Sequence, residues 1–294
     1  MTKAASSTKK KETCRIISHE KLATGIFDLR VESTLAGQAV PGQFAGLYVP
    51  DSANLLPRPI SICDADEKKM SLRFVYRMTA EEAGTGKISR LKAGDTIEVL
   101  GLLGNGYDVS TAQGKRAVLM GGGIGVPPML YLAKSLAASQ VTSKAVTLVM
   151  GYRNAETFLA DEFRQYGDLH IATDDGSVGT HGTVIDVLKS SGASESHDST
   201  SGDSAVNDSI YFACGPKPML KALKEYVYGM SADETGDTVN RPKMYISLEE
   251  RMACGVGVCL GCITKTVHKD VHSGVHNARI CTDGPVFEAS DVEL

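Results

Sequence analysis

Four cysteines near the end of the chain limit what this sequence can build. Successive members are separated by four, two and eighteen residues, and the set is Cys254, Cys259, Cys262 and Cys281. A C-x4-C-x2-C run followed by a more distant cysteine has the ligand spacing of plant-type [2Fe–2S] sites. Thiolates are the soft donors that such clusters need, and a lysine or carboxylate could not replace them. The spacing therefore predicts an iron–sulfur site held by these four cysteines.

Glycines between these cysteines suit the same site. Gly255, Gly257 and Gly261 permit positive φ angles and let backbone N–H groups approach sulfur. A structural zinc site is the alternative for this segment. Zinc prefers two separated C-x2-C pairs, however, and only Cys259 and Cys262 form such a pair.

The remaining cysteines are Cys14, Cys63 and Cys214, each in an apolar, strand-like run. We expect them to be small core residues. Structural disulfides are disfavoured because the opening residues show no apolar export signal and the cytosol is reducing.

Length and charge exclude several classes of protein. A chain of 294 residues predicts about two domains. With 31 basic against 35 acidic residues and no basic block interleaved with aromatics, nucleic acid is not an expected partner. No apolar run approaches the roughly 20 residues of a membrane span. We expect a cytoplasmic protein in which residues 1–12, including Lys9–Lys11, form a solvated tail.

Residues 13–112 show short β-branched or aromatic runs separated by turn signals, with one helical stretch at 85–91. Such spacing predicts a small antiparallel β-barrel. The expected strands are 14–19, 26–32, 43–49, 58–63, 70–78 and 96–103.

Residues 113–242 change to alternating strands and helices, which predicts a parallel α/β sheet. The expected strands are 117–120, 146–150, 170–173 and 210–213, and the expected helices are 129–138, 157–163, 184–189 and 216–228. The serine-rich stretch 190–209 predicts a flexible surface insertion, and 229–240 a polar linker. Residues 243–294 are expected to form a small cluster-binding segment that its metal organises.

Two glycine turns follow strands of the predicted parallel sheet. The first contains Gly121, Gly122, Gly123 and Gly125 before a helix, as a pyrophosphate-binding turn requires, although tight packing explains such glycines too. The second is Cys214-Gly215-Pro216. Turns at the ends of two strands of one sheet face the same crevice, so the pair is more specific than either turn.

Three further features of this half are left open by the sequence. Cys214 is a nicotinamide contact or a buried small side chain. The Asp174–Asp175 pair suits ribose binding or ordinary turn chemistry, and Arg153 follows a strand where it could meet a 2′-phosphate, so the sequence leaves NAD and NADP open.

The barrel half contains a cation and a hydroxyl on one kinked strand, in Arg58-Pro59-Ile60-Ser61. An arginine can bind a diphosphate through two hydrogen bonds, and a serine can contact a flavin edge. Val75-Tyr76-Arg77 and Gly84-Thr85 are ambiguous in the same way. Taken singly, each of these motifs also fits an ordinary surface strand or turn.

In combination these motifs resemble the ferredoxin reductase family of flavoproteins. The order of parts carries the resemblance: Arg-Pro-x-Ser in a barrel, Gly-Gly-x-Gly-x-x-Pro, then Cys-Gly-Pro-x-Pro-Met. The run from Ser247 to Cys259, with Cys281-Thr-Asp-Gly-Pro-Val-Phe287, is similar to the electron transfer subunits of heteromeric, NAD-dependent dihydroorotate dehydrogenases. The serine-rich insertion and the segment 265–279 depart from that pattern, and we interpret both as longer loops.

The resemblance implies cofactors for each motif. FAD would be held by Arg58, Pro59, Ile60, Ser61, Val75, Tyr76, Arg77, Gly84 and Thr85. NAD would be held by Gly121, Gly122, Gly123, Gly125, Cys214, Gly215 and Pro216, and the cluster by the four late cysteines. No residue of this chain is expected to act as an acid or base catalyst.

The implied function is electron transfer in pyrimidine (UMP) biosynthesis. Electrons from the FMN of a separate catalytic subunit would cross the cluster and FAD to NAD⁺, in a heterotetramer with two copies of each chain. One alternative is the small subunit of an NADH-dependent ferredoxin:NADP⁺ oxidoreductase, which shares the motifs. A second is a non-enzymatic metal-binding regulatory module whose glycine turns serve packing.

Overall fold

The computed structural model describes residues 9–51, 53–142, 145–190, 208–230, 241–270 and 274–294. The chain forms two compact units. The first comprises Met1–Tyr107 and Glu250–Val286, and the second comprises Asp108–Glu249 and Phe287–Leu294.

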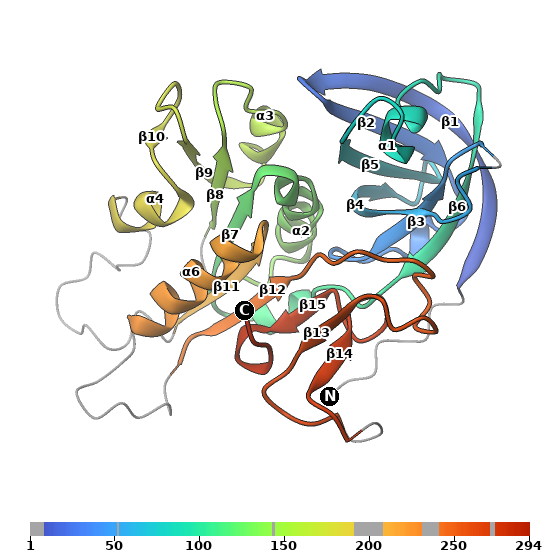
Figure 1. Ribbon diagram of the computed structural model, residues 1–294. Helices are drawn as coiled ribbons and strands as arrows, with labels where there is room; N and C mark the ends of the chain where they lie inside the picture. Colours follow the sequence, from blue (N-terminus) through green and yellow to red (C-terminus); the bar gives the residue numbers. More distant parts are fainter. Residues whose placement is uncertain (1–8, 52, 143–144, 191–207, 231–240, 271–273) are drawn as a thin grey trace. The chain divides into compact units, whose positions relative to one another are not determined.

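The first unit is built on a closed six-stranded barrel in which every neighbouring pair is antiparallel (Figure 1). Its interior is apolar, with Leu29, Leu72 and Phe74 fully buried. The strand order is β1-β2-β5-β4-β3-β6. The strands are β1 (Lys10–Ala23), β2 (Ile26–Glu32), β3 (Phe44–Tyr48), β4 (Arg58–Asp66), β5 (Ser71–Arg77) and β6 (Thr96–Leu103), with helix α1 (Gly84–Ile88) between β5 and β6.

The second unit contains a seven-stranded sheet of order β10-β9-β8-β7-β11-β12-β15. Residues 117–120 in β7 are all buried, as in a parallel strand covered on both faces. The strands are β7 (Arg116–Gly122), β8 (Val146–Tyr152), β9 (Gly167–Thr173), β10 (Thr180–His181), β11 (Ser209–Cys214), β12 (Lys243–Ser247) and β15 (Val286–Glu288).

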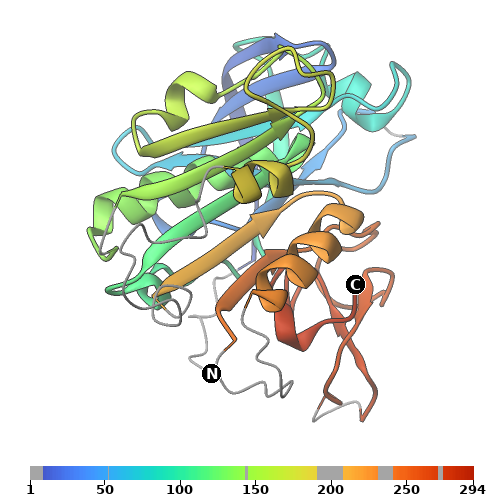
Figure 2. The same ribbon diagram turned by 90° about the vertical axis from the view of Figure 1, so that its left-hand side faces the viewer.

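Helices cover both faces of this sheet (Figure 1). Helix α2 (Val126–Ser139) packs on β7, β8 and β11, beside the short α3 (Ala160–Phe163). Helix α4 (Val184–Ser190) packs on β8 and β9 and contacts α6 (Lys217–Gly229), which packs on β12. Figure 2 turns this second face toward the viewer, with α4 in yellow and α6 in orange. The antiparallel barrel and the parallel sheet confirm these two parts of the predicted fold class.

The side of the sheet on which new strands are added changes between β7 and β11. From β7 the chain adds β8, β9 and β10 on one side, and it then returns to place β11 on the other side of β7. The pairing of β7 with β11 is parallel and sets Gly121 opposite Cys214. Both glycine turns therefore lie at carboxyl ends of adjacent strands, where open α/β sheets bind their ligands.

The structure corrects the expected N-terminal tail. Strand β1 begins at Lys10, whereas residues 10–12 were expected to be solvated and unpaired. Lys10 pairs with Gly101 and Lys11 with Leu100 of β6, because the first strand must extend this far to close the barrel. The Lys11 ammonium also forms an ion pair with Glu98.

The segment 243–294, predicted as a unit of its own, is divided between the two units. β12 and β15 join the parallel sheet, whereas Glu250–Val286 belongs with the barrel. Part of the segment interpreted as a longer loop is an antiparallel pair, β13 (Ile263–Lys265) with β14 (Asn277–Arg279). The predicted insertion 190–209 and linker 229–240 lie almost wholly outside the described residues.

No helix within the described ranges is long and apolar enough to span a bilayer.

Gly125 tests how tightly the two glycine turns pack. A Cβ atom at this position would lie 2.3 Å from the carbonyl oxygen of Cys214. We expect Gly125→Ala to lower the free energy of unfolding by about 1–3 kcal/mol, since the two turns would have to separate. The measurement is chemical denaturation.

The matched control is Gly229→Ala in α6, where an added Cβ meets no atom within 4 Å. Equal stability of the two variants would contradict the packing of the turns.

Candidate functional site

Three of the four late cysteines, Cys254, Cys259 and Cys262, lie in a loop whose backbone amides point at sulfur, and Cys281 follows β14 in a second stretch. The Val256 and Cys259 N–H groups donate to Cys254 Sγ at 3.4 and 3.5 Å, and the Gly261 N–H donates to Cys259 Sγ at 3.4 Å. Such hydrogen bonds stabilise thiolates in iron–sulfur sites.

Positive φ angles in the loop are only partly where they were predicted. Gly255 (67°) and Gly257 (88°) have them, but the third belongs to Leu260 (55°) instead of Gly261. Gly257 is also constrained by space, since a Cβ there would lie 2.7 Å from Thr282 Cγ2.

The environments of the sulfurs differ. Burial alone would raise the pKa of Cys254, but hydrogen bonds from Val256, Cys259 and Val258 outweigh it and lower this pKa to about 6. Burial and the neighbouring Cys262 raise the pKa of Cys281 to about 12. Cys262 and Cys281 are buried and Cys259 is exposed, so one edge of the loop faces solvent.

The cysteines are arranged as two pairs. The Cys259 side chain helps to lower the pKa of Cys254, and the Cys262 side chain helps to raise that of Cys281, so each affected sulfur has one cysteine neighbour acting on it directly. In the parts of the chain that the structure describes, no group of three or more His, Cys, Asp or Glu side chains is placed to hold one metal ion. A [2Fe–2S] cluster takes four cysteines over two irons, so two pairs fit its chemistry.

An ion pair flanks Cys281 on both sides in the sequence. Arg279 donates from Nε (3.1 Å) and from its backbone N–H (2.8 Å) to Asp283 Oδ2, and from Nη2 (3.1 Å) to Oδ1. The guanidinium also reaches the Gly257 carbonyl at 3.5 Å. The pair therefore connects the two stretches that carry the cysteines. Sequence analysis missed it, although opposite charges two residues before and two after Cys281 were a usable signal.

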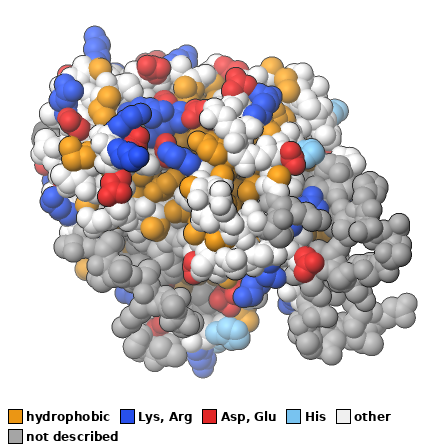
Figure 3. Space-filling view, turned by 180° about the vertical axis from the view of Figure 1, so that it is seen from behind, with side chains coloured by type: hydrophobic (Ala, Val, Ile, Leu, Met, Phe, Trp, Pro, Cys, Tyr) orange, Lys and Arg blue, Asp and Glu red, His pale blue; other side chains and the backbone are white. Residues whose placement is uncertain are grey.

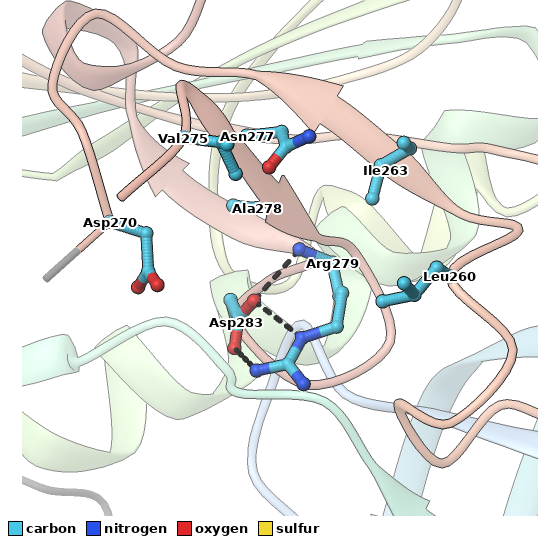
Figure 4. Close-up of a pocket in the computed structure, with 8 residues that line it drawn as sticks. All are labelled: Leu260, Ile263, Asp270, Val275, Asn277, Ala278, Arg279 and Asp283. Carbon is cyan, nitrogen blue, oxygen red and sulfur yellow. Dashed lines mark hydrogen bonds and ion pairs between the residues drawn. The ribbon is translucent and has the colours of Figure 1, made fainter. Parts of the chain in front are cut away.

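Figure 4 shows this ion pair at the wall of a hollow of about 350 Å³. Much of the remaining wall is apolar side chain, including Leu260, Ile263 and Val275, which are 59%, 45% and 47% exposed. Val258, in the cysteine loop, is 80% exposed. We call Val258, Leu260, Ile263 and Val275 the cluster rim. Four exposed apolar residues beside a metal-binding loop are typical of a surface that a partner covers.

Asn105 attaches the cysteine segment to the barrel. Its N–H donates to the Gly284 carbonyl at 2.7 Å, its side-chain amide donates to the Asp283 carbonyl at 2.9 Å, and its Oδ1 accepts from the Val286 N–H at 3.2 Å. Gly104 has no room for a side chain, since a Cβ there would lie 2.5 Å from Pro285 Cδ. Three hydrogen bonds from one residue thus place Cys281 in the barrel's own unit.

The predicted FAD residues come together on neighbouring elements of the barrel. Residues 58–61 lie on β4, residues 75–77 on the adjacent β5, and residues 84–85 begin α1. The Arg58 guanidinium lies against Gly84, where a Cβ would be 2.0 Å from Nε. Seen from behind, Lys and Arg side chains gather in the upper left of Figure 3, over the barrel unit.

The Tyr76 side chain is buried in the protein interior. The residue is 1% exposed, and its hydroxyl donates to His19 Nε2 at 2.9 Å. His19 Nδ1 lies 2.7 Å from the Leu91 carbonyl and must be the donor there, which leaves Nε2 as the acceptor. Burial lowers the pKa of His19, which favours this neutral form. A flavin could therefore meet Tyr76 through its backbone.

Thr85 likewise uses its side chain locally. The Thr79 N–H donates to Thr85 Oγ1 at 3.1 Å. This contact closes the turn before α1, so the predicted role of Thr85 in binding rests on its main chain.

Close contacts surround most glycines of the two turns in the parallel sheet. Besides Gly125, a Cβ would lie 2.3 Å from Met219 Sδ at Gly122, 2.8 Å from Met150 Sδ at Gly121, and 2.4 Å from Met219 Cε at Gly215. Gly123 has a φ of 56°. Close packing is therefore part of the explanation of these glycines. Their role in binding NAD stays a prediction.

The structure favours different explanations for the residues that the sequence left open. Cys214 is 1% exposed, and burial, followed by Glu249, raises the pKa of its thiol, so it is a neutral core side chain. Cys14 and Cys63 are also buried, as predicted. Asp175 Oδ1 accepts from the N–H and hydroxyl of Ser177, which is turn chemistry. Arg153 is exposed at the end of β8.

Three features define the class of the protein. They are an antiparallel barrel, a parallel sheet with two strand-end glycine turns, and a C-terminal segment with four cysteines. The protein is an iron–sulfur electron transfer protein with the ferredoxin reductase fold. The fold is shared with a ferredoxin NADP⁺ reductase of Neisseria gonorrhoeae solved with FAD and NADP, at a TM-score of 0.65 and 14% identity over 81% of this chain and 98% of that one.

More similar proteins narrow the class. Residues 249–293 match the iron-sulfur cluster binding domain of dihydroorotate dehydrogenase B. Electron transfer subunits of dihydroorotate dehydrogenase B (NAD(+)) are 38% identical in Geobacillus sp. (strain WCH70) and 39% in Bacillus caldolyticus, over 97% of this chain and 99% of each relative. The chain belongs to the family of electron transfer subunits of dihydroorotate dehydrogenase B.

A structure of the NADH-dependent reduced ferredoxin-NADP oxidoreductase is also similar, with a TM-score of 0.73 and 26% identity over 96% of this chain and 90% of that one. This similarity matches the first alternative from the sequence, at a lower identity than the dihydroorotate dehydrogenase B subunits.

The Arg279–Asp283 pair predicts how firmly the cysteine segments hold together. We expect Asp283→Asn to release iron about two- to five-fold faster under a chelator, as the loss of up to about 1 kcal/mol from a partly exposed ion pair implies. The measurement is the bleaching rate of the visible absorbance, with iron and acid-labile sulfide counted before and after.

The control is Glu32→Gln, which breaks the exposed ion pair with Arg15 on the barrel. Identical bleaching rates in the two variants would show that the Arg279–Asp283 pair does not hold the cysteine segments.

Proposed function

We propose that this chain carries electrons from the FMN of a dihydroorotate dehydrogenase catalytic subunit through a [2Fe–2S] cluster and FAD to NAD⁺, in pyrimidine (UMP) biosynthesis. The observation that carries the proposal is that the segment with the four cysteines and the predicted flavin residues lie in one compact unit. A bound flavin exchanges single electrons with a cluster and hydride with a nicotinamide.

The chain's own residues have distinct tasks in this proposal. Cys254, Cys259, Cys262 and Cys281 bind the cluster, and backbone N–H groups stabilise their thiolates. Arg58 binds the flavin diphosphate, and Ser61 on the same strand contacts the ring edge. The turns at 121–125 and 214–216 bind NAD at the switch point between β7 and β11.

The partner belongs to the same proposal. We assign the cluster rim as the surface that meets the FMN-containing catalytic subunit, in a heterotetramer of two copies of each chain. Apolar side chains stand exposed beside the exposed Cys259, so a partner seated there would approach the cluster closely. None of the seven cysteines forms a disulfide, which supports a cytoplasmic location.

The division of labour between two chains is testable with this chain alone. Supplied with NADH, the purified protein should bleach its flavin and reduce an artificial acceptor, because the flavin and nicotinamide sites lie in this chain. It should form no orotate from dihydroorotate, which can be followed by chromatography. Orotate formation by the lone chain would overturn the proposal, and a protein without flavin would favour the regulatory-module alternative.

The docking surface has its own test. Leu260→Glu places a charge in the cluster rim, so we expect at least a ten-fold weaker affinity for the catalytic subunit, measured by size-exclusion chromatography or interferometry. NADH oxidation with an artificial acceptor should be unchanged. Leu22→Glu on β1 is the control, since Leu22 is 36% exposed outside the rim. Normal affinity of Leu260→Glu would show that the partner docks elsewhere.

A further inference from the structure

A series of hydrogen bonds connects Asp51 to Arg58 in the loop between β3 and β4. No sequence motif indicated it. The Asp51 carboxylate forms an ion pair with Lys87 of α1 and accepts from the Ala53 N–H at 2.9 Å. Its Oδ2 also accepts from Asn54 Nδ2 at 3.0 Å. Asn54 Oδ1 in turn accepts from Arg58 Nη2 at 3.1 Å.

These contacts fix the direction of the Asn54 amide. Because the Asp51 carboxylate has only acceptors to offer, it must face the NH₂ end of the amide. The oxygen end then faces the Arg58 guanidinium, which also donates to the Leu56 carbonyl at 3.2 Å. Asn54 is therefore the residue through which a carboxylate orients the arginine without touching it.

The charge of Arg58 distinguishes it from neighbouring cations. Lys87 is paired with Asp51, and Arg90 with Glu82. Arg58 is hydrogen-bonded to two neutral oxygens, and no ion pair among the described residues includes it. The guanidinium is thus held in place while its charge stays available for an anion.

We propose that Asn54 is a positioning residue for the FAD diphosphate, oriented by Asp51 so that Arg58 is held but not neutralised. This assignment rests on the proposed function, in which the barrel binds FAD. It predicts that a carboxylate at position 54 is harmful although it would offer Arg58 a stronger partner. If the contacts served loop closure only, that added ion pair would be neutral or favourable for binding.

The test compares FAD with riboflavin, which has the same ring system but no diphosphate. Apoprotein of the full chain is titrated with each, by quenching of flavin fluorescence. For Asn54→Asp we expect the Kd for FAD to rise about ten-fold or more, since a charge-assisted contact to the diphosphate is lost. The Kd for riboflavin should stay unchanged, which also shows that the variant folds.

Two further variants separate the causes. In the exchange variant Asp51→Asn with Asn54→Asp, two carboxylates no longer face each other, but Arg58 still meets one. Its FAD affinity should stay low if neutralisation of Arg58 is the cause. Glu82→Gln removes the exposed partner of Arg90 after α1 and should leave both affinities unchanged.

The proposal is overturned if Asn54→Asp binds FAD as the wild type does, if it weakens FAD and riboflavin equally, or if the exchange variant recovers FAD affinity. A wild-type chain that binds riboflavin and FAD equally well would remove the diphosphate site altogether. Failure of the wild type to bind any flavin would instead contradict the proposed function itself.

Discussion

The hydrogen bonds of Asn105 attach the segment that follows Cys281 to the barrel. Asn105 follows the last barrel strand and satisfies three backbone groups of the segment 283–286, on which Cys281 depends for its place. With these hydrogen bonds, the cysteine loop and the barrel form one unit, as expected for centres that exchange electrons.

Two charged groups of this structure, the Cys254 thiolate and the Arg58 guanidinium, are hydrogen-bonded by neutral groups. Backbone N–H groups stabilise Cys254 as a thiolate against the effect of its burial. An amide side chain holds Arg58 in place, whereas Lys87 and Arg90 are paired with carboxylates. A dipole can orient a charged group without cancelling its charge, which a counter-ion cannot do. This distinction is the basis of the proposed role of Arg58 in binding a charged ligand.

Much of the architecture was predictable from periodicity. All six barrel strands were expected within a few residues of their observed bounds, because turn residues separate short β-branched runs. Strand β1 was predicted too short, since its first residues are lysines whose pairing with β6 is a demand of barrel closure. The pairing of β13 with β14 was missed because these three-residue strands have almost no periodicity.

By itself the sequence determined the four-cysteine pattern, the change from barrel to α/β sheet, and the glycine turns, since spacing and side-chain type are local properties. Only the tertiary structure decided that Glu250–Val286 joins the barrel while its flanks join the parallel sheet. It also decided that Tyr76 faces His19 and that Lys87 pairs with Asp51. The physical reason is that hydrogen-bond partners distant in the chain are selected by the closed fold, and a one-dimensional pattern does not record them.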